Sequence, residues 1–265
     1  MTLCISLSAR PSNNGTRFHN FLYDALGLNW IYKAFAPTNL EQAIAGVRGL
    51  GIRGCAISMP YKESVIALVD QMDASAAAID SVNTIVNDGG VLTAYNTDYT
   101  AIAQLIESNG LDPAWSVLLR GSGGMAKATA AAFRDAGFRD VTVVARNQET
   151  GQALAGLYGF RWKAELEDSN ADVLVNVTPI GMAGGPDVGS LAFPEPAIAG
   201  AQAVFDVVAV PAETPLVKAG RAAGMKVISG AEVMTIQALE QFVLYTGIRP
   251  TEAQVRAAEE FMREP

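Results

Sequence analysis

The stretch S-V-L-L-R-G-S-G-G-M-A-K-A, residues 116–128, decides the fold of the second half of the chain. Its first part, Ser116–Arg120, has the composition of a short buried strand, and the alanine-rich residues after the glycines predict a helix. Between the two, Gly121, Gly123 and Ala126 fit the pattern G-x-G-x-x-A. This order of strand, glycine turn and helix predicts the first βα unit of a Rossmann-type parallel sheet.

The glycine turn also predicts a dinucleotide site. The first glycine permits a sharp turn, the second lets the backbone approach a pyrophosphate, and the small third residue allows the helix to pack closely on the strand. The start of the helix offers N–H groups and the positive end of its dipole to phosphates. We therefore expect nucleotide contacts from Gly121, Gly123, Gly124, Met125 and Ala126.

The next strand, V-T-V-V-A-R-N at residues 141–147, indicates which cofactor binds. NAD sites usually end this strand with an acidic residue for the ribose 2′-hydroxyl, whereas this chain has Arg146 and Asn147. A guanidinium suits a 2′-phosphate through paired, charge-assisted hydrogen bonds, so the sequence favours NADP. An exposed arginine with no ligand is the alternative interpretation. A methyltransferase also places glycines after a strand, but it would need an acidic ribose-binding residue at this position.

Strand-like and helix-like segments alternate along the rest of the chain. The first half predicts strands at Leu3–Ser8, Trp30–Ala36, Gly54–Met59, Val82–Val86 and Val91–Tyr95, and helices at Thr16–Leu26, Leu40–Leu50 and Lys62–Met72. The second half predicts apolar parallel strands at Val141–Ala145, Ala171–Val177 and Ala203–Val208, and closing helices at Glu232–Tyr245 and Thr251–Arg263.

These segments predict an α/β protein of two domains separated by a cleft. Residues 1–100, joined by the C-terminal helices 238–265, would form a substrate-binding and catalytic α/β domain. Residues 101–237 would form the NADP-binding Rossmann domain with its parallel sheet.

Composition excludes several classes of partner. The chain has 265 residues, 50% of them hydrophobic, and a net charge of −8 without a cluster of Lys and Arg, which argues against nucleic acid. Neither a secretory signal nor an apolar run of the roughly 20 residues that cross a bilayer is evident, so we expect a cytoplasmic protein with no membrane partner. We expect a small-molecule substrate and a monomer or homodimer.

Cysteine and histidine usage narrows the chemistry further. Cys4 and Cys55 lie in apolar, strand-like stretches and are expected to be small core residues rather than a disulfide framework. His19 is the one histidine, so a multi-histidine metal site is impossible and we expect no metal. Its place in an amphipathic helix predicts a packing role.

Three polar signatures precede the glycine turn: M-P-Y-K ending at Lys62, S-V-N-T around Asn83, and Y-N-T-D ending at Asp98. Oxidation of an alcohol needs a base within hydrogen-bond reach of the hydroxyl, and an ammonium group donates the proton in the reverse direction. We expect Lys62 to exchange this proton and Asp98 to hold Lys62 and the hydroxyl in place. The alternatives are structural: Lys62 would begin a surface helix, and Asp98 would cap one.

Together these signatures resemble the shikimate dehydrogenase family, closest to its shikimate dehydrogenase-like branch. The resemblance covers nearly the whole chain and also includes F-H-N near residue 20, A-R-N at 145–147, N-V-T-P-I-G-M at 176–182, D-V-V-A-V-P at 206–211 and the helix that carries Gln237. It implies reversible, NADP-dependent oxidation of the C3 hydroxyl of shikimate to 3-dehydroshikimate, without a metal, in the chorismate pathway of aromatic amino acid biosynthesis.

The resemblance also implies roles for individual residues. Lys62 and Asp98 match the catalytic pair, and Asn83 and Gln237 match residues that bind substrate hydroxyls, although Gln237 could instead satisfy a buried carbonyl. Further nucleotide contacts are expected from Asn176 and Thr178, which match the loop beside the nicotinamide ribose, and from Gly230.

The pattern breaks at the substrate carboxylate. Two serines of the family fall on Asn13 and Gly15 here, and a tyrosine falls on Ala209. Asn13 can still donate hydrogen bonds, but a glycine cannot replace a hydroxyl. Each missing bond to a charged group costs on the order of 1.5–3 kcal/mol, so we expect slow shikimate turnover or altered specificity. Quinate or another cyclic hydroxy acid is the alternative substrate, and a non-catalytic sensor of nucleotide and ring acid is the alternative class.

Overall fold

The computed structural model describes residues 1–166 and 170–263, and the chain divides into two compact units. The first unit comprises Met1–Thr97 and the chain from Thr235 on, and the second is Asp98–Met234. The first unit is therefore discontinuous in sequence, whereas the second is one continuous segment. The boundaries expected from the sequence lay after residues 100 and 237, and the roles expected of the two domains remain predictions.

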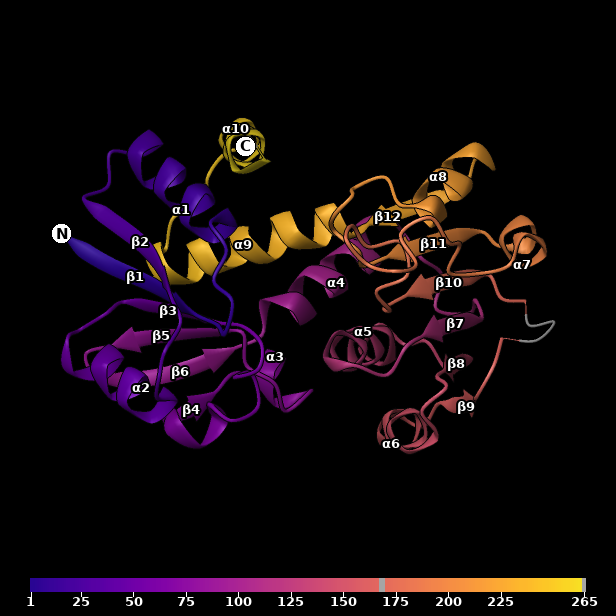
Figure 1. Ribbon diagram of the computed structural model, residues 1–265, viewed down its shortest axis with the longest axis horizontal. Helices are drawn as coiled ribbons and strands as arrows, with labels where there is room; N and C mark the ends of the chain where they lie inside the picture. The colour runs from indigo at the N-terminus through magenta and orange to yellow at the C-terminus, as the bar shows by residue number, and fades with distance from the viewer. Residues whose placement is uncertain (167–169, 264–265) are drawn as a thin grey trace. The chain divides into compact units, whose positions relative to one another are not determined.

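The first unit is built on a mixed six-stranded sheet with the order β2-β1-β3-β5-β6-β4 (Figure 1). β1 pairs in parallel with β2 and β3, while β5 is antiparallel to β3 and β6. β5 and β6 form a hairpin, whose turn has positive φ at Gly89 and Gly90. The strands are β1 (Thr2–Leu7), β2 (Trp30–Phe35), β3 (Gly54–Ile57), β4 (Gln71–Met72), β5 (Thr84–Asp88) and β6 (Val91–Tyr95).

Helices cover both faces of this sheet (Figure 1). On one face Ile44 and Val47 of α2 pack in a core with Ile5 and Leu7 of β1. On the other face α1 and α9 bury a cluster of aromatic side chains, and α10 packs along α1. The helices are α1 (Asn14–Ala25), α2 (Leu40–Gly49), α3 (Ala74–Ala77), α9 (Gly230–Thr246) and α10 (Glu252–Arg263).

His19 lies at the centre of the aromatic cluster, as its helical position predicted. It is fully buried, and its ring stacks on Tyr32 with 4.4 Å between centroids. Neither ring nitrogen has a hydrogen-bond partner among the described residues. Burial lowers the pKa of His19 to about 3, an effect that the Gln241 amide only partly offsets. Cys4 and Cys55 are buried free thiols, as expected.

The helix predicted over Lys62–Met72 is wrong. These residues form turns, a single 3₁₀ turn at Ile66–Leu68 and the short strand β4. Asp70 explains the difference. Its carboxylate accepts a 2.7 Å hydrogen bond from the Leu92 N–H and forms an ion pair with Arg48. These bonds anchor the segment at the edge of the sheet, and they hold the pKa of Asp70 below its usual range.

The second unit contains a fully parallel sheet with the order β9-β8-β7-β10-β11-β12. Numbered within the unit, this order is 3-2-1-4-5-6, which defines the Rossmann fold. The strands predicted around residues 117–120, 141–144, 173–176 and 203–206 are confirmed, whereas β9 and β12 were missed. The strands are β7 (Val117–Arg120), β8 (Val141–Val144), β9 (Arg161–Lys163), β10 (Val173–Asn176), β11 (Ala203–Asp206) and β12 (Lys226–Ser229).

Helices also lie on both faces of the Rossmann sheet (Figure 1). α7 and α8 pack on the face that carries Leu118, Leu174 and Val204, while α5 and α6 lie on the opposite face. The chain therefore leaves β7 and β10 toward opposite faces, and the crevice at their carboxyl ends is where this fold binds ligands. The helices are α4 (Thr97–Ser108), α5 (Gly124–Asp135), α6 (Gln148–Tyr158), α7 (Glu195–Gly200) and α8 (Pro215–Ala222).

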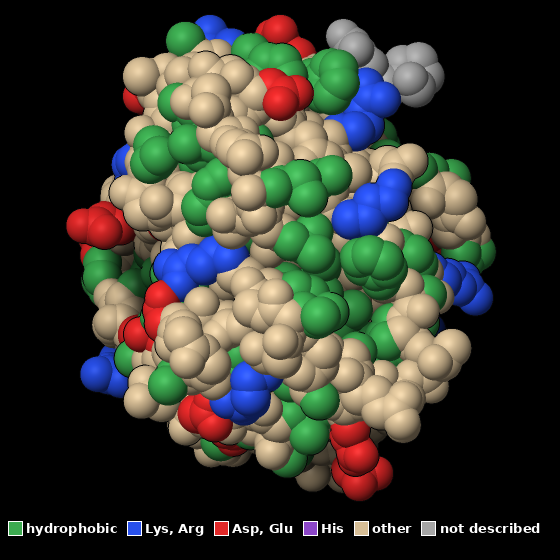
Figure 2. Space-filling model, turned by 90° about the vertical axis from the view of Figure 1, so that its left-hand side faces the viewer, with side chains coloured by type: hydrophobic (Ala, Val, Ile, Leu, Met, Phe, Trp, Pro, Cys, Tyr) green, Lys and Arg blue, Asp and Glu red, His purple; other side chains and the backbone are tan. Residues whose placement is uncertain are grey.

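Two features bear on binding to nucleic acid and to membranes: the distribution of charge on the surface and the apolar length of the helices. In the view of Figure 2, Lys and Arg side chains are scattered among Asp and Glu rather than gathered in a patch. Within the described ranges, none of the helices combines the length and apolar character needed to cross a bilayer.

Candidate functional site

The turn after β7 can be made only by glycine at its first position. Gly121 has φ +124°, and a Cβ there would lie 2.9 Å from Val177 Cγ2 and 3.1 Å from Thr178 Cγ2. Its N–H donates to the Val144 carbonyl oxygen at 2.9 Å. The turn is thus pressed between the ends of β8 and β10, and a side chain would force the loop after β10 away.

Gly123 has the opposite property. It is the N-cap of α5 with φ −82°, and a Cβ there would meet no atom within 4 Å. The protein itself therefore does not require glycine at this position, but a ligand approaching the backbone would. Gly124 and Met125 follow in the first turn of α5, and Ala126 is completely buried. The open space beside a helix start fits a pyrophosphate.

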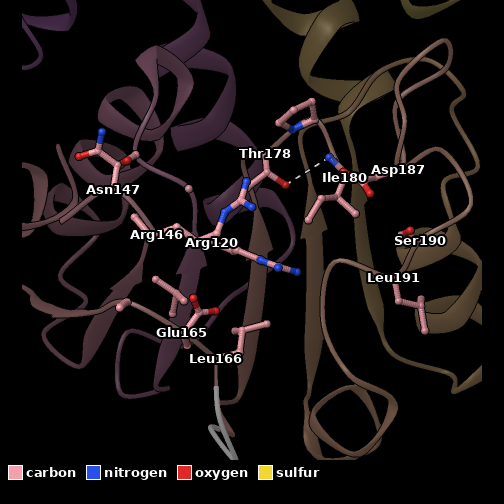
Figure 3. A pocket seen from close by; sticks show the side chains of 16 residues that line it. Arg120, Arg146, Asn147, Glu165, Leu166, Thr178, Ile180, Asp187, Ser190 and Leu191 are labelled. Carbon is pink, nitrogen blue, oxygen red and sulfur yellow. Dashed lines mark hydrogen bonds between the residues drawn. The ribbon is translucent and has the colours of Figure 1, made fainter. Parts of the chain in front are cut away.

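A pocket of about 470 Å³ opens at the carboxyl ends of β7, β8 and β10 (Figure 3). Four of the residues expected at the nucleotide line it: Gly121, Arg146, Asn147 and Thr178. All lining residues belong to the second unit, so the pocket is complete within that unit. Sequence reasoning missed five further polar side chains that also line it, those of Arg120, Ser122, Glu165, Asp187 and Ser190.

The end of β8 places Arg146 in the solvent-exposed part of this pocket. Asn147 has a structural duty, because its side chain caps α6 by accepting the Thr150 N–H at 3.1 Å. The Thr150 hydroxyl in turn bonds the Ser122 hydroxyl at 2.8 Å. The glycine turn and the start of α6 are thus tied together beside Arg146.

The loop after β10 is organised by Asn176, which is completely buried. Its amide donates to the Ile180 carbonyl at 3.1 Å and to Asp206 Oδ1 at 2.9 Å. Its oxygen accepts the N–H and the hydroxyl of Thr178 at 3.1 and 2.6 Å. The amide is therefore fully occupied, and Asn176 shapes the loop while Thr178 faces the pocket.

Asp206, at the carboxyl end of β11, completes this network and was not singled out from the sequence. It is fully buried and accepts hydrogen bonds from the Thr214 hydroxyl at 2.6 Å and the Val208 N–H at 3.1 Å, besides the Asn176 amide. Desolvation raises its pKa despite these donors. An acidic residue directly after an apolar strand was the signal that could have identified it.

Gly230 marks a close approach of two backbones. It begins α9, and a Cβ there would lie 2.3 Å from the Val208 carbonyl carbon and 2.4 Å from the Val207 oxygen. Any side chain at this position would separate α9 from the loop after β11. The structure explains the glycine by packing, and its contact with a nucleotide remains a prediction.

Lys62 and Asn83, two of the expected catalytic and substrate residues, lie close together in the first unit. The Lys62 carbonyl oxygen accepts the Val82 N–H at 2.8 Å, which places Lys62 beside the start of β5. Asn83 is buried there, with its amide donating to Thr97 Oγ1 at 3.0 Å and its oxygen accepting the Thr97 N–H at 2.8 Å. Thr97 begins α4, and Asp98 follows it in the first turn.

Asn83, which directly precedes β5, therefore ties the start of β5 to the start of α4. Its Nδ2 group has two N–H bonds, and the hydrogen bond to Thr97 uses one of them. The second can serve a substrate hydroxyl. The helix expected after Asp98 is present, and Asp98 retains only 9% exposure in its first turn.

A second glutamine of α9, Gln241, makes contacts that were not predicted from the sequence. Gln241, one turn after Gln237, donates to the Asn83 carbonyl at 3.3 Å and to the Thr84 hydroxyl at 3.0 Å. Gln241 therefore satisfies a buried carbonyl, the role that was considered as the alternative for Gln237. Gln237 is half-buried on the same helix, and its contact with substrate remains a prediction.

The expected carboxylate site lies at the start of α1. Asn13 is the exposed N-cap residue, and its side chain makes no capping hydrogen bond. A Cβ on Gly15 would lie 3.5 Å from the Tyr32 ring and hydroxyl, an ordinary contact distance. Packing therefore tolerates a side chain at residue 15, and the weaker carboxylate binding expected from its absence remains a prediction.

Known proteins agree with these features. The family profile described as "Shikimate dehydrogenase substrate binding domain" matches residues 12–85. The "Shikimate dehydrogenase-like protein" of Haemophilus influenzae is 56% identical over 98% of this chain and 96% of its own. The "Shikimate dehydrogenase (NADP(+))" of Moorella thermoacetica is 35% identical over 93% of this chain and 87% of its own.

Solved structures extend the comparison to the fold. A shikimate 5-dehydrogenase-like protein superposes with a TM-score of 0.98 at 55% identity, covering 99% of this chain and 98% of that one. The quinate dehydrogenase of Corynebacterium glutamicum in complex with NAD superposes with a TM-score of 0.89 at 28% identity, covering 98% of both chains.

Fold and site together define a two-unit oxidoreductase with a Rossmann-type dinucleotide site. Among the described residues, no group of three or more His, Cys, Asp or Glu side chains is placed to hold a metal ion. The chain belongs to the shikimate dehydrogenase family.

Proposed function

We propose that the protein is an NADP-dependent dehydrogenase that interconverts shikimate and 3-dehydroshikimate at the C3 hydroxyl, with slow turnover or altered specificity. The observation that carries the proposal is a Rossmann crevice in which Arg146 follows β8 at the position where an NAD site has an acidic residue. The relative from Moorella thermoacetica is named for NADP(+), which supports the same cofactor. A cytoplasmic location is part of this proposal.

The residues present fit that cofactor. Gly121 to Ala126 and the start of α5 would hold the pyrophosphate, and Arg146 would hold the 2′-phosphate. The bound nicotinamide supplies the redox chemistry. Lys62 would exchange the proton of the substrate hydroxyl, Asp98 would hold Lys62 and this hydroxyl in place, and Asn83 would bind a neighbouring hydroxyl.

The substrate preference is the less constrained part. Asn13 offers one amide in place of a serine hydroxyl and Gly15 offers none, so binding of the ring carboxylate is expected to be weak. Kinetic constants for shikimate and quinate, each with NADP and NAD, test the proposal directly. Efficient oxidation of quinate with a preference for NAD would refute both the cofactor and the substrate.

Quinate is the second candidate substrate, because the quinate dehydrogenase of Corynebacterium glutamicum shares the fold. That protein was solved with NAD, whereas this chain presents Arg146 at the position that discriminates the two cofactors. A sensor without catalysis would bind both ligands and show no turnover above background with any cyclic hydroxy acid.

A further inference from the structure

Arg120 is a charged residue in an unusual place. It ends β7 directly before the glycine turn, in a strand whose other residues are buried and apolar. Its side chain is half-buried, and Nη1 donates a hydrogen bond to the Ala192 carbonyl oxygen. Burial of a guanidinium costs free energy, so an arginine here needs a compensating interaction.

A second guanidinium shares the same pocket. Arg120 and Arg146 extend from neighbouring strands toward the middle of the cavity (Figure 3). Burial and the nearby charge of Arg146 lower the pKa of Arg120. Two cations held this close repel each other, and an anion between them would remove the repulsion.

Acidic side chains offset these charges in part. Glu165, which follows β9, and Asp187, in the loop after β10, line the same pocket and counter the charge on Arg120. Glu165 is exposed and lies at the mouth with the two arginines (Figure 3). A phosphate entering here would be attracted by the arginines and repelled by Glu165.

We propose that Arg120 is a second guanidinium for the 2′-phosphate of the cofactor, acting with Arg146, and that Glu165 opposes this binding. Among described residues, the side chain of Arg120 makes its hydrogen bond through Nη1 to Ala192, and the guanidinium has further N–H groups to offer. The bond to Ala192 holds the group in place, which lowers the entropy lost on binding a phosphate. The inference rests on the proposed NADP function and adds Arg120 to its specificity.

Calorimetric titration with 2′,5′-ADP and 5′-AMP tests this assignment, because the two probes differ in the 2′-phosphate and need no turnover. Arg120→Met should weaken the binding of 2′,5′-ADP by about 10-fold or more, as expected for the loss of a hydrogen bond to a charged group. It should weaken the binding of 5′-AMP by less than about threefold. The affinity of the Arg120→Lys variant for 2′,5′-ADP should lie between those of the unaltered protein and the Arg120→Met variant. The exposed Arg139, in the same unit and outside the pocket, gives the control Arg139→Met, which should change neither affinity.

Glu165→Gln provides an independent test with the opposite sign, on an exposed residue whose replacement leaves the fold intact. It should tighten 2′,5′-ADP severalfold at low ionic strength, less so at high salt, and leave 5′-AMP unchanged. Equal weakening of both probes by Arg120→Met would show that Arg120 only braces the loop at Ala192 and would overturn the inference. If Glu165→Gln leaves the affinity for 2′,5′-ADP unchanged, the proposed opposing role of Glu165 is overturned. If the unaltered protein binds neither 2′,5′-ADP nor NADPH, the proposed NADP function itself fails.

Discussion

The two units place their functional residues in different ways. In the second unit the nucleotide crevice is made by consecutive residues after β7 and by the ends of adjacent parallel strands. In the first unit Lys62, Asn83 and the start of α4 are joined by hydrogen bonds between segments far apart in sequence. A local motif therefore encodes the nucleotide site, whereas the substrate site depends on tertiary structure.

This difference bears on where change is tolerated. Gly121 cannot accept a Cβ, because the loop after β10 presses on it. At the expected carboxylate site, Gly15 has room for a side chain and Asn13 is exposed. Residues 13 and 15 of the first unit can therefore vary without disturbing its core, whereas Gly121 of the glycine turn cannot.

The largest expected effect is on catalysis by the pair Lys62 and Asp98. Lys62→Ala and Asp98→Asn should each lower kcat by about 10²–10⁴-fold, because each removes a group expected at the reacting hydroxyl. Lys33→Ala, an exposed lysine on β2, is the matched control and should leave kcat unchanged. Turnover that survives both site substitutions would contradict the assigned roles.

A pair of glycine substitutions compares packing with ligand binding in the second unit. Gly121→Ala should destabilise the protein by about 1–3 kcal/mol, because its φ of +124° and the contact with Val177 both oppose a side chain. Gly123→Ala should leave stability within about 0.5 kcal/mol and still weaken NADPH binding by roughly 10-fold, since a Cβ fills only the open space beside α5. Urea unfolding and NADPH fluorescence titration measure the two quantities.

Restoring the family residues tests the tolerance of the first unit. The double substitution Asn13→Ser with Gly15→Ser should raise kcat/KM for shikimate by about 10-fold or more, since it returns two hydroxyls to the carboxylate site. The KM for NADP should stay constant. A gain for quinate but not for shikimate would indicate a different natural substrate.

The last prediction concerns stability as a function of pH. The pKa of His19 falls from 6.5 to about 3 on folding, so the unfolded chain takes up a proton that the folded protein excludes. The contribution of neutral His19 to the free energy of unfolding is therefore fully present above pH 6.5. Below that pH it decreases by about 1.4 kcal/mol per pH unit. His19→Phe should remove this slope between pH 6 and about 4 in urea unfolding, and an unchanged slope would contradict the assignment.

The sequence predicted most of the Rossmann unit because a parallel sheet needs continuous apolar strands, and β7, β8, β10 and β11 have them. It failed for β9, which is only three residues long and mostly exposed. It also failed for the segment after Lys62, where apolar spacing imitated a helix and Asp70 bound the sheet edge instead. Local periodicity carries no information about such distant partners.

The candidate site shows the same limit. Gly121, Arg146 and Thr178 were identified because motifs mark them, and they do meet in one crevice. Arg120, Asp206 and Gln241 were missed because their importance comes from burial and from hydrogen-bond partners 30 to 158 residues away in the sequence. Asn176 matched a motif for ligand contact, yet its amide serves the loop.

The divided sequence of the first unit has a consequence for biosynthesis. Arg17 of α1 donates hydrogen bonds of 2.9 and 2.7 Å to the Phe261 carbonyl oxygen, a contact that spans 244 residues. As the chain leaves the ribosome, Asp98–Met234 is complete while α1 still waits for α9 and α10 to be translated. The aromatic side chains of α1 stay uncovered during that interval, so the nascent protein is most vulnerable to aggregation just before its last helices emerge.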